Sequence, residues 1–194
     1  YPKDTPLERL GINREILERH FGTGLEEAAA VAEPPVRGEP VNRLPGMKRI
    51  VLVGVGSSWR DAKVAKAVYE DLLSRGVEVL FYDPVEISNR GIKLDPKTDL
   101  IVGMSWSGAT SSMVRLFEWL QSEGFVTVAI TGKPDSDMGR LCKWSGGTLN
   151  VLSGNEQSVA TTKGFESILF SLCLLAVHLS QMQGDPDLEE QRQG

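Results

Sequence analysis

Short apolar runs alternate with stretches of helical periodicity from residue 48 onward. The runs are rich in β-branched residues and end at glycine or turn residues, so they predict strands at 49–54, 77–82, 99–104, 125–131 and, more weakly, 147–152. The periodic stretches predict helices at 60–74, 111–123, 137–144 and 159–182. The segment from Asp83 to Gly91 is predicted as a loop. Strands alternating with helices of this length indicate an α/β fold with a parallel sheet.

The domain organisation follows from the same pattern. Helical spacing at 12–21 and 25–32, followed by proline-rich breaks, indicates an N-terminal helical segment and connector over 1–46. We expect the main domain at 47–183, and a polar tail or the start of a linker at 184–194. The domain is predicted as a three-layer sandwich around a five-stranded parallel sheet in the flavodoxin-like order 2-1-3-4-5. Ligands of such sheets bind where the strand order reverses, here between the first and third strands.

Two loops rich in serine and glycine follow those two strands. They read Gly54-Val55-Gly56-Ser57-Ser58 and Ser105-Trp106-Ser107-Gly108-Ala109-Thr110. Each loop opens a predicted helix, where unpaired backbone N–H groups and the helix dipole favour an anion. The number of hydroxyls in the second loop exceeds what capping one helix needs. We therefore predict a small phosphorylated ligand.

These loops have other interpretations. The glycines of the first loop fit a tight turn, or the start of a dinucleotide fingerprint, but Trp59 stands where the third glycine would fall. Glu78 and Asp83 match the required acidic residue only loosely. The second loop is also compatible with an over-capped helix. A Walker-type loop is excluded because no Gly-Lys-Ser/Thr follows.

Composition is that of an ordinary globular domain. The 194 residues are 41% hydrophobic and 24% charged, with a net charge of −5, which argues against a nucleic-acid partner. Cys142 and Cys173 are in no metal or redox spacing, and two histidines make a histidine-rich metal site improbable. We see no signal peptide and expect a cytoplasmic protein. Because the sequence begins with Tyr1 rather than Met, we interpret it as a processed, trimmed or excised piece.

A third segment completes a family resemblance. Glu156-Gln157-Ser158-Val159-Ala160-Thr161-Thr162-Lys163-Gly164-Phe165 opens the last helix and, alone, is a polar loop. Together the three segments resemble, in order and spacing, those of the sugar isomerase (SIS) domain family. They are most similar to the first SIS domain in the isomerase half of glutamine:fructose-6-phosphate amidotransferases. There the three corresponding segments read, in order, Gly-Cys-Gly-Thr-Ser, Ser-Gln-Ser-Gly-Glu-Thr and Glu-Ile-Gly-Val-Ala-Ser-Thr-Lys-Ala-Phe. The resemblance covers roughly residues 45–182.

The resemblance implies roles for single residues. Ser57 and Ser58 would contact the phosphate or nearby sugar hydroxyls. Ser105, Ser107 and Thr110, helped by the backbone of Trp106, would hold the phosphate, while Val159 and Thr161 would line the sugar; Lys163 receives no role. Two residues depart from the pattern, since Trp106 replaces a glutamine and Ala109 a glutamate. An indole can only donate a hydrogen bond, so Trp106 would stack on the sugar or pack against the neighbouring helix.

The resemblance leaves the catalytic residues open. Ketose–aldose isomerisation needs a general base, which in the amidotransferases is a glutamate of the second SIS domain, with a histidine from the partner subunit. The candidates in this chain are Glu156, Glu86 and His20, the last by crossing to a partner subunit; His178 is interpreted as a packed core residue. The chain is thus a piece of a two-domain isomerase, a one-domain enzyme with a site at a dimer interface, or a non-catalytic binder.

The last predicted helix, 159–182, is apolar nearly all round. Such a helix is buried on more than one side, so we expect it to pack against a second SIS domain or a second copy in a homodimer. Lys163 and Glu166 open the helix and His178 interrupts it, so we expect no membrane span.

The sequence therefore predicts a phosphosugar-binding SIS domain of a ketose–aldose isomerase, or of an aminating or deaminating relative, with no cofactor. The alternatives are a phosphosugar-sensing regulatory domain and, third, a nucleotide-binding α/β domain.

Overall fold

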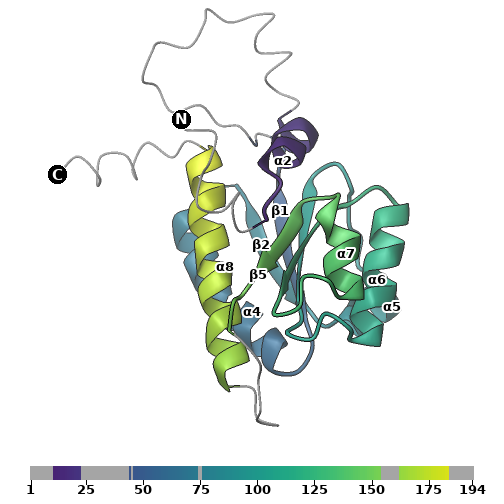
Figure 1. Cartoon of the computed structure of the whole chain (residues 1–194). Helices are drawn as coiled ribbons and strands as arrows, with labels where there is room; N and C mark the ends of the chain where they lie inside the picture. The colour runs from purple at the N-terminus through teal and green to yellow at the C-terminus, as the bar shows by residue number, and fades with distance from the viewer. Residues whose placement is uncertain (1–10, 23–43, 45, 74–75, 154–161, 184–194) are drawn as a thin grey trace, which may run out of the picture.

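The fold is a parallel sheet covered on both faces by helices (Figure 1). The computed structural model describes residues 11–22, 44, 46–73, 76–153 and 162–183. Its elements in chain order are α2 (Arg14–Phe21), β1 (Arg49–Gly54), α4 (Ser57–Leu72), β2 (Glu78–Tyr82), α5 (Pro84–Arg90), β3 (Asp99–Met104), α6 (Ser111–Ser122), β4 (Val126–Thr131), α7 (Asp137–Lys143), β5 (Gly147–Asn150) and α8 (Thr162–Gln183).

The five strands pair in parallel in the order β2-β1-β3-β4-β5, which confirms the predicted fold class and strand order. β1 and β3 match their predicted ranges, and both are buried almost throughout. Such central strands form continuous apolar runs because helices cover both of their faces.

Side chains of β1 alternate between two apolar layers. Ile50 and Leu52 pack with α4 and α8 in one core cluster, whereas Val51 and Val53 pack with α5, α6 and α7 in the other. Figure 1 shows the same division, with α4 and α8 on one side of the sheet and α5 to α7 on the other. The period of two along a strand is what sends successive side chains to opposite layers.

One predicted loop is a helix. The sequence pattern predicts an irregular segment after β2, but Pro84–Arg90 forms α5. The side chain of Asp83 caps the helix by accepting from the backbone N–H of Val85, and the side chain of Glu86 accepts from the backbone N–H of Asp83. These two residues form a complete capping box, and a proline stands in the first turn. Gly91 ends the helix in the left-handed conformation. The prediction of a loop is wrong because these start and stop signals outweigh the turn preference of Pro and Asn in a segment this short.

The N-terminal helix is part of the same core. α2 falls within the predicted 12–21, and its Leu17 and Phe21 are fully buried. Its flanks bind beneath the amino ends of the strands, where Asn13 donates to the carbonyl of Gly146 at 2.9 Å and Gly46 donates to that of Phe21 at 2.7 Å. The helix predicted at 25–32 lies outside the described residues.

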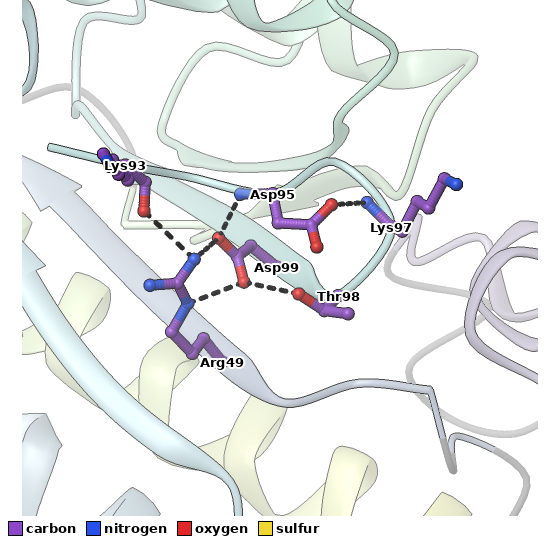
Figure 2. Close-up of polar contacts among 6 residues, drawn as sticks. All are labelled: Arg49, Lys93, Asp95, Lys97, Thr98 and Asp99. Atoms are coloured by element: carbon purple, nitrogen blue, oxygen red, sulfur yellow. Dashed lines mark hydrogen bonds and ion pairs between the residues drawn. The ribbon is translucent and has the colours of Figure 1, made fainter.

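A buried ion pair joins β1 to β3 at this amino edge (Figure 2). Asp99 is fully buried and accepts two hydrogen bonds from the guanidinium of Arg49, that from Nε at 2.7 Å. It also accepts from the backbone N–H of Asp95 at 2.7 Å and from the hydroxyl of Thr98 at 3.0 Å. Because the donors satisfy both carboxylate oxygens, the charge is tolerated without water, and the cluster fixes the strands at the edge opposite the two serine loops.

α8 is a core helix along much of its length. Ile168, Leu172, Leu175, Ala176 and Leu179 are buried in the α4 layer, as expected for an apolar helix. By length and composition alone Lys163–Gln183 could cross a membrane, so its polar residues do not by themselves exclude a span. Half of that stretch is buried inside the structure, as in the core helix of a globular domain.

Candidate functional site

The two serine loops begin side by side at the carboxyl edge of the sheet. Gly54, the last residue of β1, pairs with Met104, the last residue of β3. The chain leaves β1 toward α4 on one face and leaves β3 toward α6 on the other, as Figure 1 shows. This is the point where the strand order reverses, and it is where open α/β sheets bind their ligands. The predicted position of the site is therefore present in the fold.

The first loop is shorter than predicted because α4 starts at Ser57 rather than at residue 60. Gly56 forms the N-cap with φ of +63°, a conformation that favours glycine. Ser57 is exposed in the first turn, whereas Ser58 is buried and close to Gly54, where an added Cβ would lie 2.8 Å from the Ser58 backbone. Ser57 and Ser58 thus belong to a helix N-terminus held tightly against the end of β1.

Hydrogen bonds within the second loop define its shape. The hydroxyl of buried Ser105 accepts from the backbone N–H of Gly108 at 3.1 Å and lies 3.1 Å from the hydroxyl of Thr110. Gly108 has φ of +61°, and an added Cβ there would collide with the side chain of Ser136. The partly exposed Ser107 accepts from the backbone N–H of Ala109 at 3.3 Å. Of the predicted phosphate ligands, Ser105 and Thr110 are thus brought within hydrogen-bond distance, and Ser107 lies in the same loop.

The N-termini of α4 and α6 differ in their capping from those of α2, α5 and α7. The described N-termini of α2, α5 and α7 are each capped by a side chain, from Asn13, Asp83 and Ser136. The N-caps of α4 and α6, Gly56 and Thr110, make no side-chain cap hydrogen bond. The first N–H groups of α4 and α6 therefore remain available to a ligand, and both helix dipoles place partial positive charge at the same edge.

Trp106 packs across the ends of three strands. Its indole N–H donates to the hydroxyl of Ser153 beyond β5 at 3.0 Å, and the ring lies against Gly132 beyond β4. The ammonium of Lys133 is 5.2 Å from the ring centroid. The carbonyl of Trp106 accepts from Gly132 N–H at 3.0 Å and from the Thr131 hydroxyl at 3.2 Å. The side chain therefore anchors the loop, a role that the sequence does not predict.

A hollow of about 550 Å³ lies on the α7 side of the second loop. Ser107 and Ala109 form one wall, and the opposite wall includes Lys133 and Arg140 together with Asp135 and Asp137. Its two cations and two carboxylates balance in charge, so this hollow attracts an anion less than the uncapped helix ends do.

The first part of the third segment, residues 156–161, is outside the described residues. This applies to Val159 and Thr161, which are predicted to line the sugar, and to Glu156, the first candidate base. Lys163 is exposed in the first turn of α8. Their roles stay predictions.

The other candidate bases have structural roles in this chain. The Glu86 carboxylate accepts from the Asp83 backbone and pairs with Arg90 at 3.1 Å, so it caps α5. A ring nitrogen of His20 lies 2.6 Å from the carbonyl of Pro96, just before β3, which places His20 at the amino edge of its own chain. His178 is buried in α8, as expected. Catalytic use of Glu86 would require it to leave its cap.

Asp61 is a residue that the sequence reasoning missed. It lies on α4 one turn after Ser58, is fully buried, and has no hydrogen-bond partner for either carboxylate oxygen among the described residues. Burial raises its pKa from the ordinary 3.8 to about 7. The available signal was the helical spacing itself, because 58, 61, 62, 65 and 69 form one face on which the other members are serine, alanine and tyrosine.

The described part of the chain offers no metal-binding cluster and no reactive thiol. No cluster of three His, Cys, Asp or Glu residues there could hold a metal ion. Cys142 and Cys173 are both free, and burial raises the pKa of the Cys142 thiol to about 12.

Comparison with known proteins places these features in a family. A family model described as SIS domain matches residues 44–178. The chain is 28% identical over 192 residues to a glutamine–fructose-6-phosphate aminotransferase (isomerizing) of Gloeobacter violaceus, which covers 96% of this chain and 28% of that protein. It is 31% identical over 100 residues to arabinose 5-phosphate isomerase KdsD of Pseudomonas aeruginosa, covering 52% of this chain and 30% of that protein. The chain thus spans less than a third of the length of either relative.

Solved structures share the fold. The C-terminal domain of glucosamine-fructose-6-phosphate aminotransferase from Francisella tularensis superposes with a TM-score of 0.61 at 22% identity, over 76% of this chain and 41% of that one. The c3406 protein of E. coli CFT073, solved in complex with a sugar phosphate, has a TM-score of 0.58 at 16% identity, over 91% of this chain and 95% of that one.

Proposed function

Because the chain belongs to the SIS domain family, we propose that it binds a phosphorylated sugar, with the phosphate between the N-termini of α4 and α6. We propose further that it serves a ketose–aldose sugar-phosphate isomerase, or an aminating or deaminating relative. Two relatives, a fructose-6-phosphate aminotransferase and an arabinose 5-phosphate isomerase, support this range of substrates.

One observation carries the proposal. β1 and β3 end side by side at the switch point, and the helices that follow them, α4 and α6, both lack the side-chain cap that α2, α5 and α7 have. Two helix N-termini supply several N–H donors and the equivalent of about half a positive charge each. The hydroxyls of Ser57, Ser107 and Thr110 add donors at the same edge. A phosphate satisfies these groups without any net positive charge on the chain.

The catalytic base has to come from beyond the groups described at the site. Glu156 of the third segment is the candidate within this chain, and a second SIS domain or a second copy is the candidate outside it. Phe170 and Val177, two turns apart on α8, are 64% and 39% exposed, and Val64 on the adjacent α4 is 52% exposed. This apolar face supports a partner of either kind, because exposed apolar patches commonly mark interfaces.

A ligand titration by thermal shift tests the function. The stability of the protein should rise with fructose 6-phosphate, glucosamine 6-phosphate or arabinose 5-phosphate, by about 2.7 kcal/mol when the ligand concentration is one hundred times Kd. Free fructose and NAD should leave it unchanged. A response to NAD instead of the sugar phosphates would favour the nucleotide-binding alternative and overturn the proposal.

A double variant locates the phosphate. Ser107→Ala with Thr110→Ala removes two hydroxyl donors, each worth about 1.5–3 kcal/mol toward a charged group, so affinity should fall at least a hundredfold. Ser122→Ala is the matched control, since Ser122 lies at the other end of α6 and bonds to the carbonyl of Trp119. Equal affinity of the double variant and this control would contradict the assignment of the second loop.

A phosphosugar sensor is the second candidate function. Two candidate bases favour the sensor, because neither of them is at the site: Glu86 caps α5, and His20 lies at the amino edge of the sheet. Conversion of fructose 6-phosphate, glucosamine 6-phosphate or arabinose 5-phosphate, followed by NMR, separates the two. Binding without turnover in the full-length protein would favour the sensor.

A further inference from the structure

The proposed phosphosugar site leaves one buried carboxyl group without a use. Asp61 is shielded from solvent, and both of its oxygens lack a hydrogen-bond partner within the described residues. A buried polar group without a partner destabilises a fold and is rare in native structures. Asp61 therefore calls for an explanation that packing alone does not give.

The position of Asp61 relates it to the N-terminus of α4. It lies three residues, about 4.5 Å of helix rise, beyond Ser58 on the same buried face. Side chains of an α-helix tilt toward its N-terminus, so the Asp61 carboxyl covers the turn that contains Ser58. The same turn carries the uncapped N–H groups proposed to hold the phosphate. Asp61 is thus a fully buried carboxyl, without a hydrogen-bond partner among the described residues, on the side of α4 that leads to its N-terminus.

Within the part of the chain that the structure describes, no neighbouring charge compensates that of Asp61. α4 packs against α8, β1 and β2. The charged or titratable side chains on the described parts of those elements are Lys163, Glu166, Cys173, His178, Arg49, Glu78 and Tyr82. Arg49 is engaged with Asp99 at the opposite edge, while Lys163 and Glu166 are exposed. Burial alone accounts for the raised pKa of Asp61, about 7, with no contribution from these groups. The carboxyl is consequently near its point of ionisation at neutral pH.

We propose that Asp61 belongs to the phosphate end of the site and that the protein takes up a proton on this carboxyl when it binds a phosphosugar. The inference rests on the proposed function. A bound phosphate dianion one helical turn away disfavours a second negative charge, so the neutral carboxyl is favoured in the complex. The proton comes from solvent and converts the carboxylate of Asp61 to the carboxylic acid. Conversely, ionisation of Asp61 at higher pH weakens binding.

Proton uptake by the unaltered protein is the first test. Fructose 6-phosphate is titrated by calorimetry at pH 8 in two buffers of different ionisation enthalpy. The phosphate is already a dianion there, because its second pKa is about 6. A rise of one pKa unit in the complex predicts uptake of about 0.4 proton per ligand. Uptake near zero would overturn the inference, even if the sugar phosphate binds.

The second test uses Asp61→Asn, which places an uncharged side chain of the same shape at this position. A rise of one pKa unit in the complex predicts that the Kd of the wild type increases about sixfold between pH 6.5 and pH 8.5, relative to that of the variant. The ligand's own ionisation is common to both proteins and cancels in this ratio. Asp71→Asn, which removes an exposed carboxyl from the same helix, should behave like the wild type.

The outcomes separate this inference from the function on which it rests. Binding with the same pH profile in wild type and Asp61→Asn overturns the role of Asp61 and leaves the proposed function intact. If neither protein binds a sugar phosphate at any pH, the proposed function fails and the inference with it. If Asp61→Asn does not fold, as judged by circular dichroism, proton uptake by the wild type decides alone.

Discussion

Replacing Asp61 by asparagine should stabilise the folded protein at alkaline pH and do little at acidic pH. The carboxyl is fully buried without a partner among the described residues, and its pKa is raised from 3.8 to about 7 by burial. Between those values the folded state holds a proton that the unfolded state has released. The free energy of unfolding of the wild type therefore decreases as pH rises from about 4 to about 7, and is level above that.

The magnitude follows from the size of the shift. Each pKa unit corresponds to about 1.36 kcal/mol, so the wild type should lose about 3 kcal/mol between pH 5 and pH 8 through this residue alone. The asparagine of the variant cannot ionise, and its amide resembles the neutral carboxyl in size and in its need for hydrogen bonds. The stability advantage of the variant over the wild type should thus be about 3 kcal/mol larger at pH 8 than at pH 5.

Urea unfolding followed by tryptophan fluorescence at pH 5, 6, 7 and 8 measures this difference directly. Asp71→Asn serves as the control, because it removes a carboxyl from the exposed side of the same helix without relieving burial. A difference between Asp61→Asn and wild type that stays constant from pH 5 to pH 8 would refute the reasoning, since it would mean that Asp61 does not change its protonation in this range.

Two further predictions concern the two edges of the sheet. Arg49→Met should lower the free energy of unfolding in urea by about 3 kcal/mol, because it leaves the buried Asp99 charge without its cation. The control Lys66→Met breaks an exposed pair with Glu70 and should lower it by less than about 1 kcal/mol. Equal losses of stability in the two variants would contradict the role of the buried cluster. Gly108→Ala should weaken fructose 6-phosphate binding at least tenfold by calorimetry, because a Cβ collides with Ser136 and distorts the second loop. Gly91→Ala is the control, because Gly91 has a similar positive φ but open space around it, and it should leave the affinity unchanged. Wild-type affinity in Gly108→Ala would show that the second loop is not part of the site.

The strands and their order could be predicted because central strands are dense in apolar residues. Residues 49–54 and 99–104 have hardly any other interpretation, and their pairing in the middle of the sheet follows from the alternation with helices. α5 was missed for a different reason. Its seven residues include Pro, Ser and Asn, and its stability derives from the Asp83–Glu86 capping box, whose spacing has to be recognised rather than summed from propensities.

The site was predictable where sequence motifs coincide with strand ends, and not where it depends on packing between distant segments. Ser105 and Thr110 come within hydrogen-bond distance because one short loop carries both, and Ser107 lies in the same loop. The contact of Trp106 with Ser153 joins residues 47 apart, and no local pattern predicts it. Asp61 appears as an ordinary polar residue in a helix, and only the packing of α4 against α8 and the sheet reveals that it is buried.

The central claim is that the N-termini of α4 and α6 together hold a phosphate. The most direct test is a titration of ¹⁵N-labelled protein with fructose 6-phosphate, followed by NMR. We expect the largest shifts at the backbone amides of residues 57–59 and 111–113, with little change for free fructose. Shifts confined to other parts of the chain, or equal shifts with the unphosphorylated sugar, would contradict the claim.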